Sequence, residues 1–499
     1  MPKGDRSSYR LEQQFSSGSK DKTYKMAAKP SKRGLVQTHT GRKRNIMKRR
    51  KNRFRSVIML SLVAFVMLSP QAREHVLGEF GGIDELIQSA TAPYHQYPLE
   101  ASYTLSKIAN VQNNGGQGAI FETILIPPPV TSAMGRNAQF EYTNGDDPME
   151  PTVIQKTEVI TVKLGSHEVN VPIDGLPSKD YADREIRGGN EIWWPDVGSG
   201  AQECPVAKCV IVKMNLEPGE SSSYTFDVQV SSYSYSWWDG GQRVNSRIEG
   251  KSMGINLEKS GTFDDYQTRN SQKAVEFGTE LWYEKGRPDY AINGQDAIVK
   301  SIADTISATL PEGKSDNAYA FARASFDYLH ANVQYDHDAP RTARSGPACL
   351  AGNLGDCDEQ TNAYFSILRT KGIPGWYAFG ILGDPHFSDD GWEAHAWGYI
   401  QLPLKESWCE DHSITLATCF IEAPVDVVNN KWLVSTPTAY IDWMENPDPS
   451  GQIIYDYYHP TRTDPHQHPI DRKRGYETTG DVNLAGGSYQ IKMYAESLD

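Results

Sequence analysis

The segment GDCDEQTNAYFSILRTKGIPGWYAFG at 355–380 constrains the fold of this chain more than any other part of it. Asp356 can cap a helix, and Glu359 stands three residues later, at the capping-box position. A glycine and a proline near the end of the segment stop the helix. The pattern therefore predicts a helix with Cys357 at its first helical position. The residues expected on its buried face are Tyr364, Ile367 and Leu368.

A thiol at a helix start meets unpaired backbone N–H groups and the positive end of the helix dipole, and both favour the thiolate. The flanking Asp356, Asp358 and Glu359 act in the opposite direction, so the thiol needs a base. The strand-like segment EAHAWGYIQLP places His395 on one face and small or apolar residues on the other. If the small face packs on the helix, His395 can meet Cys357, and the two form an activated thiol nucleophile.

These segments resemble the transglutaminase-like superfamily, a cysteine-dependent group that includes transglutaminases, peptide N-glycanases and many microbial proteases or amidases. The resemblance runs through FDYLHANVQYD, GDCDE, GIPGWYAFG and HAW, and it covers residues 295–445. It implies an α+β, papain-like catalytic core with Cys357 as nucleophile, His395 as general base and no cofactor. Two amphipathic helices are expected before the cysteine, with apolar positions Ile298, Ile302 and Ile306 in one and Phe321, Ala324 and Tyr328 in the other.

The third member of the site departs from the family pattern. The resemblance implies an aspartate that orients the histidine, in a pattern like Trp-x-x-x-Asp-Pro-Thr. Here the segment is KWLVSTPTAYIDW, and Thr436 occupies the aspartate position. Threonine can accept a hydrogen bond but carries no charge. Asp442, six residues on, or Asp426, ten before, could substitute, and the choice stays open.

Residues 96–290 are expected to form a β-sandwich-like domain, and residues 446–499 a C-terminal extension. Strands are predicted at 101–113, 119–126, 153–164, 168–171, 206–214 and 223–230, with glycine, proline, asparagine and aspartate between them. NGGQG between the first two strands indicates a hairpin. No residue of this region suggests catalysis, which favours a spacer or binding role.

The charge is divided unequally along the chain. Residues 1–55, a predicted disordered tail, carry eighteen Lys or Arg and three Asp or Glu, and the other residues carry 32 basic and 60 acidic groups. The acidic body would repel phosphates, so we expect it to bind no nucleic acid. The apolar run at 56–68, within the segment 56–72, is short for a membrane span, which needs about 20 residues.

We favour a signal anchor at 56–72 over a cleaved signal peptide, because Pro70 is poorly placed for cleavage after Ala72. The basic tail would then be cytoplasmic and the body outside, with the membrane as a partner. The alternatives are a secreted protein, which a start at Met47 would suit, and a buried core helix behind a tail that binds nucleic acid.

The remaining cysteines and side-chain clusters have structural interpretations. Cys204 with Cys209 and Cys409 with Cys419 are spaced for local disulfides, which fits an oxidising compartment. Cys349 could be a buried thiol or a reversible partner of Cys357. No metal site is predicted, since two candidate groups are better explained as loops: Asp336 with Asp338, and His459, His466 and His468 with Asp464. The tryptophans near the site, Trp376, Trp392 and Trp397, are expected to pack, with a hydrophobic substrate wall as the alternative.

The sequence thus predicts an extracytoplasmic cysteine hydrolase or acyltransferase that acts on peptide or amide bonds of a protein or peptide substrate. The alternative is an envelope binding or structural protein that keeps the fold but has weakened catalysis, a hypothesis motivated by Thr436.

Overall fold

The computed structural model describes most of the chain from residue 94 onward, and all statements below concern that part. The described residues are 94–115, 119–127, 129–132, 152–171, 185–187, 189–194, 209–246, 248, 254–278, 281–283, 290–340, 343–383, 392–445, 461–464, 470–478 and 483–492. The predicted tail and apolar segment, 1–55 and 56–72, lie outside them. No helix within the described residues is long and apolar enough to cross a membrane.

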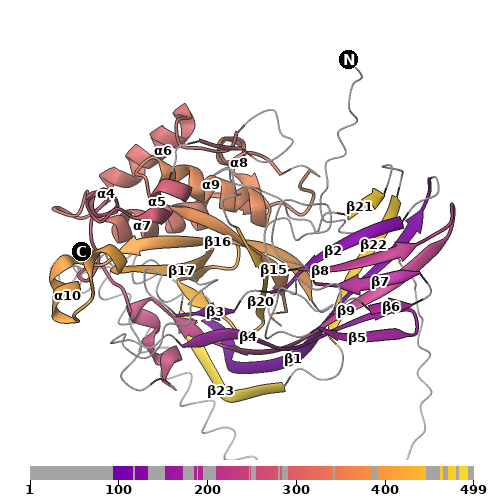
Figure 1. Cartoon of the computed structure of the whole chain (residues 1–499). Coiled ribbons are helices and arrows are strands. Elements are labelled where there is room, and N and C mark those ends of the chain that lie inside the picture. The colour runs from indigo at the N-terminus through magenta and orange to yellow at the C-terminus, as the bar shows by residue number, and fades with distance from the viewer. Residues whose placement is uncertain are drawn as a thin grey trace, which may run out of the picture. The chain divides into compact units, whose positions relative to one another are not determined.

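A five-stranded antiparallel sheet forms the centre of the predicted core, in the order β18-β17-β16-β15-β20. Its strands are β15 (Gly375–Leu382), β16 (Glu393–Pro403), β17 (Phe420–Asp426), β18 (Lys431–Trp432) and β20 (Ala439–Met444). The helices are α4 (Asp264–Thr268), α5 (Gln272–Phe277), α6 (Ala297–Ala308), α7 (Ala318–Asn332), α8 (Gly346–Gly352), α9 (Cys357–Arg369) and α10 (Glu406–Asp411). Helices α6 to α9 lie together on one side of the sheet (Figure 1).

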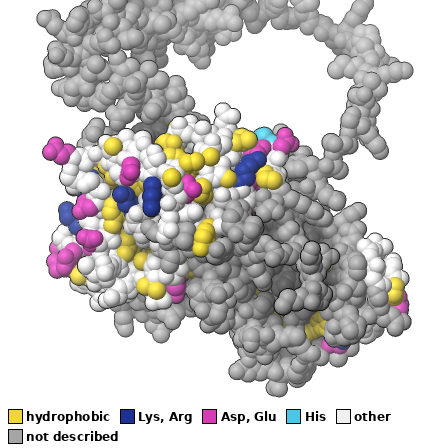
Figure 2. Space-filling model, turned by 90° about the horizontal axis from the view of Figure 1, so that it is seen from above, with side chains coloured by type: hydrophobic (Ala, Val, Ile, Leu, Met, Phe, Trp, Pro, Cys, Tyr) yellow, Lys and Arg dark blue, Asp and Glu magenta, His cyan; other side chains and the backbone are white. Residues whose placement is uncertain are grey.

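Short elements connect these layers. They are the 3₁₀ helices η2 (Asp239–Asn245) and η3 (Leu416–Thr418) and the strands β10 (Tyr235–Ser236), β11 (Leu281–Tyr283), β12 (Tyr290–Asn293), β13 (Gln334–Tyr335), β14 (Leu354–Gly355) and β19 (Val434–Ser435). Seen from the side of the helices, acidic, basic and hydrophobic side chains are interspersed over the described surface (Figure 2). Such a mixture is typical of a solvated surface.

The helix predicted after Asp356 forms as expected. Asp356 is the N-cap of α9, and the Asp356 and Glu359 side chains accept from each other's backbone N–H, which completes the capping box. All three predicted core residues of this helix are buried. Helix α6 also forms, but its buried face is Val299, Ala303 and Ile306, whereas Ile298 is exposed. The prediction of its apolar face is therefore confirmed at Ile306 and wrong at Ile298, while Ile302 is partly buried against the core.

Helix α9 packs on β16 through a glycine. A Cβ atom on Gly398 would lie 2.9 Å from the Phe365 ring, so the ring occupies the space that a side chain would need. Strand β16 can therefore approach the helix closely at this point. This is the packing that the small face of EAHAWGYIQLP predicts.

Gly398→Ala is expected to destabilise the protein by about 1–3 kcal/mol, because the added methyl group must displace a buried ring in a packed core. Chemical denaturation of the full chain measures this loss. Gly352→Ala is the matched control, since nothing lies within 4 Å of the Cβ position of Gly352. Equal stability of the two variants would contradict the close packing of Phe365 on β16.

The predicted sandwich consists of two antiparallel sheets. The larger has the path β22-β1-β9-β4-β3, with β23 on β1 and β5 on β4; the smaller has the order β21-β2-β8-β7-β6. The strands are β1 (Tyr94–Asn113), β2 (Ala119–Leu125), β3 (Val130–Thr131), β4 (Val153–Leu164), β5 (His167–Val171), β6 (Glu185–Arg187), β7 (Asn190–Trp193), β8 (Cys209–Asn215), β9 (Ser221–Tyr233), β21 (Thr461–Asp464), β22 (Ile470–Thr478) and β23 (Asn483–Lys492). Side chains from both sheets share one hydrophobic cluster, as a two-layer sandwich requires.

Two features of the sandwich differ from the sequence prediction. Strands β1 and β2 do not form a hairpin: β1 pairs with β9 and β2 with β8, so the connection after Asn113 crosses between the sheets. Turn residues such as NGGQG permit a reversal but do not select the partner strand. The segment 446–499 also does more than extend the core, since β22 and β23 pair with β1 and β21 pairs with β2.

The sandwich is joined to the core sheet through β20 and the turn before it. Gln155 of β4 donates to the carbonyl of Ile441 and accepts from its N–H, both at 2.8 Å. The Tyr103 hydroxyl donates to the carbonyl of Pro437 at 3.3 Å. Ile381 and Tyr440 of the core sheet belong to the hydrophobic cluster of the sandwich. The sandwich therefore contacts β20 and the turn before it.

The disulfide predicted between Cys409 and Cys419 is present. Cys209 is also disulfide-bonded, while Cys204 lies outside the described residues. Cys349 and Cys357 are free thiols. A reversible bond between Cys349 and Cys357 therefore stays a prediction.

Candidate active site

Helix α9 and strand β16 bring the predicted cysteine beside the strand that carries the predicted histidine. Cys357 is the first residue of α9 and is half-buried. Its Sγ accepts a hydrogen bond from the backbone N–H of Ala396, the residue that follows His395. The packing of α9 on β16 thus fixes the thiol next to the start of the strand.

The surroundings of Cys357 oppose the thiolate. Burial raises the pKa of the Cys357 thiol well above its usual value, and the negative charges of Asp358 and Asp356 raise it further. The N–H of Ala396 acts the other way, because it hydrogen-bonds to the sulfur. The thiol therefore needs a base to become a nucleophile near neutral pH, as the flanking acidic residues predict.

The His395 ring is held by a carboxylate and an amide. Its Nε2 lies 2.9 Å from Oδ2 of Asp426, and the Asn429 amide nitrogen lies 3.1 Å from the same ring nitrogen. The Asn429 side chain also donates to Asp426 Oδ2 at 2.8 Å, and its backbone N–H donates to Asp426 Oδ1 at 3.2 Å. Trp397 stacks on the imidazole, with the ring centroids 5.6 Å apart. With Nε2 engaged by the carboxylate, Nδ1 is the ring nitrogen suited to accept a proton.

Asp426 is buried but remains suited to carry a negative charge. Burial is the largest single influence and raises the pKa of its carboxyl group, whereas the positive charge of His395 and the hydrogen bond from its ring lower it. The Lys431 ammonium and the Asn429 amide lower it further, so the pKa of Asp426 is below its usual value. An ionised carboxylate behind the imidazole stabilises the imidazolium that forms when the ring accepts a proton.

The structure separates the three sequence candidates for the residue behind His395. Asp426 contacts the ring, although it was only a substitute in the sequence prediction. Thr436 accepts a hydrogen bond from Lys431 Nζ at 3.1 Å. Asp442 forms an ion pair with Lys107 of the sandwich. The spacing of the three candidates along the sequence could not rank them, because the pairing of β17 with β16 is what brings Asp426 near His395.

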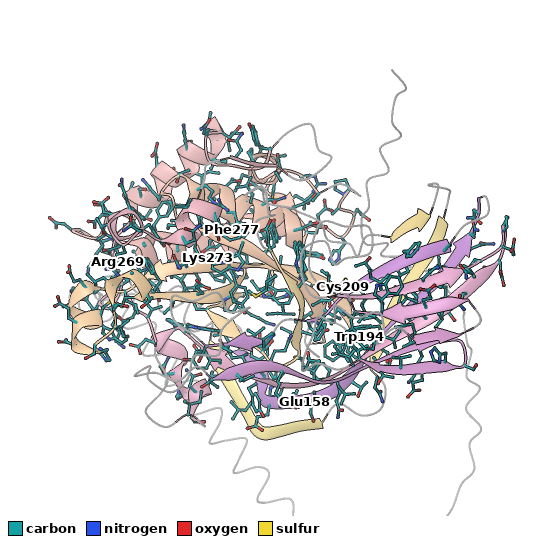
Figure 3. The ribbon with its side chains drawn as sticks, viewed as in Figure 1. Glu158, Trp194, Cys209, Arg269, Lys273 and Phe277 are labelled. Atoms are coloured by element: carbon teal, nitrogen blue, oxygen red, sulfur yellow. A yellow bond between two sulfur atoms is a disulfide. The ribbon has the colours of Figure 1, made fainter. Side chains whose placement is uncertain are left out.

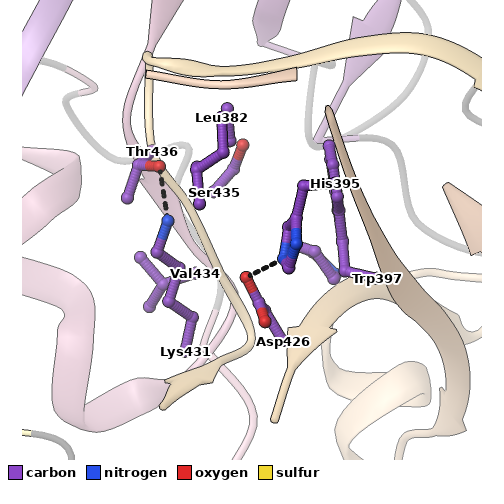
Figure 4. A pocket seen from close by; sticks show the side chains of 10 residues that line it. Leu382, His395, Trp397, Asp426, Lys431, Val434, Ser435 and Thr436 are labelled. Carbon is purple, nitrogen blue, oxygen red and sulfur yellow. Dashed lines mark hydrogen bonds and ion pairs between the residues drawn. The ribbon is translucent and has the colours of Figure 1, made fainter. Parts of the chain in front are cut away.

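A small pocket opens behind the imidazole (Figure 4). Its polar lining includes His395, Asp426, Lys431, Ser435 and Thr436, and Trp397 and Leu382 contribute apolar surface. It has room for about one water molecule, so it is too small for a peptide. The pocket is therefore part of the structure that positions the histidine.

The three tryptophans near the site do not share one wall. Trp376 is buried against α5, because Lys273 Nζ lies 4.6 Å from its ring centroid and the Phe277 ring centroid lies 5.5 Å away. Figure 3 labels Lys273 and Phe277 of that helix. Trp392 packs on Tyr103 of the sandwich, with centroids 4.8 Å apart. Only Trp397 contacts the histidine. The described contacts favour packing over a substrate wall for Trp376 and Trp392.

Among the other candidate residues, Asp336 has a structural partner in the described part of the chain. Arg344 Nη2 lies 2.7 Å from Asp336 Oδ2, and this contact holds the pKa of Asp336 below its usual value. Arg344 also pairs with Glu359 of the capping box at 2.9 Å, so it links the Asp336 side chain to the start of α9. The Cys349 thiol is buried, and burial raises its pKa to about 12. The residues His459, His466 and His468 lie outside the described residues.

Sequence reasoning missed Asn429 and Lys431. Two consecutive asparagines between apolar runs indicate a turn, and Asn430 has a left-handed φ of 51°. That turn returns the chain so that Lys431 pairs with Asp426. The sequence therefore indicated the turn, but the contact of Asn429 with His395 depends on the pairing of β17 with β16.

The part of the chain that carries the candidate site matches a known family. Residues 304–410 match the model of the transglutaminase-like superfamily. Among solved structures, a putative cysteine protease from Cytophaga hutchinsonii is 11% identical, with a TM-score of 0.38, over 80% of this chain and 100% of that one. A putative protease from Parabacteroides distasonis is 9% identical, with a TM-score of 0.17, over 57% and 62%.

No curated protein matches the chain. The match at 304–410 includes both the cysteine at the start of α9 and the histidine on β16. The chain therefore contains a domain of the transglutaminase-like superfamily.

Proposed function

We propose that the protein is a cysteine hydrolase or acyltransferase that acts on peptide or amide bonds, with Cys357 as nucleophile, His395 as base and Asp426 as the residue that orients the base. The observation that carries the proposal is the 2.9 Å contact between His395 Nε2 and the buried Asp426 carboxylate, on a strand whose next N–H meets the Cys357 sulfur. This arrangement supplies a thiol, a base and a counter-charge in one place.

The reaction follows from the positions of these groups. As Cys357 Sγ forms a bond to the amide carbonyl carbon, its proton passes to His395. The C–N bond then breaks, and His395 returns the proton to the leaving amine, which leaves a thioester on Cys357. Water, or a second amine, attacks the thioester while His395 takes its proton. The C–S bond then breaks, and His395 returns that proton to Sγ, which restores the thiol and the neutral imidazole. No cofactor is required.

We favour water over an amine as the acceptor, so that the net reaction is hydrolysis. Within the described residues, the small pocket near His395 has room for about one water molecule and is too small for an amine substrate. The Asp426 contact also weakens the reason for the alternative, a structural protein with weakened catalysis, because His395 has a carboxylate without one at position 436.

The test is to label the full chain with a thiol-directed covalent probe at pH 7 and to screen quenched fluorescent peptides for cleavage. We expect Cys357 to be labelled and C357A to be both unlabelled and inactive. C349A is the matched control and should keep both properties, since Cys349 is buried outside the site. Mass spectrometry of products with and without an added diamine separates hydrolysis from transamidation. Equal labelling of wild type and C357A would refute the proposal.

We further propose that the body of the protein lies outside the cytoplasm. The Cys409–Cys419 disulfide and the disulfide-bonded Cys209 support an oxidising compartment, and the charge division around 56–72 supports that orientation. Protease treatment of intact cells should degrade the body of an anchored protein. Its survival until the cells are lysed would contradict an exposed location.

A further inference from the structure

Lys431 is a buried lysine beside the candidate site. It is 3% exposed, and it stands directly opposite Asp426 in the β17–β18 strand pair. Its Nζ donates to the Thr436 hydroxyl at 3.1 Å, as Figure 4 shows. A lysine is almost never fully buried unless its charge is compensated. The candidate mechanism does not explain why Lys431 is buried at this position.

The Lys431 side chain is held in place by a hydroxyl group and an aromatic ring. The ammonium lies 5.2 Å from the centroid of the Tyr97 ring, a cation–π contact supplied by the sandwich. The Thr436 hydroxyl accepts one of its protons. The carboxylate of Asp426 supplies the negative charge across the strand pair. An ammonium held by the Thr436 hydroxyl and the Tyr97 ring keeps its place in the pocket that Asp426 also lines.

Asp426 in turn depends on positive charge around it. It is 6% exposed, and a buried carboxylate without nearby positive charge tends to bind a proton. Its charged or titratable neighbours are His395 on β16, Lys431 on β18 and the Cys357 thiol on α9. His395 is neutral whenever it is ready to act as a base. At that stage Lys431 is the permanent cation among these neighbours.

We propose that Lys431 is a positioning residue, whose fixed positive charge keeps Asp426 ionised and directed at His395 while His395 is neutral. The proposal rests on the proposed function. It gives Thr436 a role as the anchor of Lys431, and it makes the sandwich part of the site through Tyr97. A protonated Asp426 would no longer stabilise the imidazolium, so loss of Lys431 should be seen at acid pH.

The test measures the rate of Cys357 alkylation by iodoacetamide against pH, with the full chain and peptide mapping. Lys431→Met should move the acid limb of this profile to higher pH by about one unit, because removal of a nearby positive charge makes protonation of the site easier. At a fixed pH on that limb, the rate should fall about tenfold. Lys431→Arg keeps the charge and should keep the wild-type limb. A lysine that serves only for packing would not move the limb.

A double variant shows whether Lys431 acts through Asp426. In an Asp426→Asn background there is no carboxylate to keep ionised, so adding Lys431→Met should move the limb no further. This double variant also removes both buried charges, so it can be tested even if Lys431→Met alone does not fold. An unchanged limb in Lys431→Met, or a further shift in the double variant, would overturn the proposal. Alkylation needs no substrate, so the result is independent of whether peptide hydrolysis is found.

Discussion

Asp426→Asn is expected to lower kcat/KM for amide hydrolysis by about 10²–10⁴-fold, the size of effect expected when a catalytic histidine loses its carboxylate. The amide can keep a hydrogen bond to His395 Nε2, which lies 2.9 Å from the carboxylate now, but it cannot stabilise the imidazolium. It can also hold the ring in the wrong tautomer. The loss should fall mainly on kcat, because Asp426 is buried behind the histidine and away from substrate.

Asp442→Asn is the matched control for this prediction. Asp442 is the other acidic candidate from the sequence, but its carboxylate pairs with Lys107 of the sandwich. Its replacement should leave kcat/KM near the wild-type value, although it can lower stability. Steady-state kinetics on a cleaved peptide decide between the two. If kcat fell more in Asp442→Asn than in Asp426→Asn, Asp426 would not be the carboxylate that supports His395.

His395→Ala should lower the rate of Cys357 alkylation at pH 7 by more than about 30-fold, because an isolated thiol of ordinary pKa is only a few per cent ionised there. Burial and the charges of Asp358 and Asp356 raise the pKa of the Cys357 thiol, so the thiolate is lost as pH falls below that raised value. Without the imidazole to take the proton, reactivity should appear only above about pH 9. The wild-type protein should react near neutrality.

The comparison needs a control for access to the thiol. Trp397 stacks on the imidazole, and Trp397→Phe keeps an aromatic ring there while changing its size. This variant should retain alkylation near neutral pH. If wild type and His395→Ala gave superimposable pH profiles, His395 could not be the base for Cys357, whatever its distance from Asp426.

Local signals predicted the elements that carry the site. The capping box joins residues three positions apart, so Asp356 and Glu359 specify the start of α9 without help from the rest of the chain. The alternation in EAHAWGYIQLP likewise specifies β16 and the small face that receives Phe365. These features depend on backbone hydrogen bonds and side-chain periodicity within a short segment.

Pairings between distant segments were not predicted in the same way. Strands β22 and β23 at the end of the described chain pair with β1 at its beginning, and β1 does not pair with β2. The strand patterns themselves were recognisable in the sequence. The residues of a strand indicate that it is half-buried, but the choice of its partner strand depends on the complementarity of whole sheets.

The sequence by itself determined the nucleophile and base candidates, because Cys357 and His395 stand at recognisable starts of a helix and a strand. It also supplied three candidates for the residue behind the histidine. Only the tertiary structure placed Asp426 against His395, by pairing β17 with β16, and brought Lys431 opposite it through the turn at Asn429. The physical reason is that a buried carboxylate stays ionised only when positive charges lie near it, and here these charges come from separate strands.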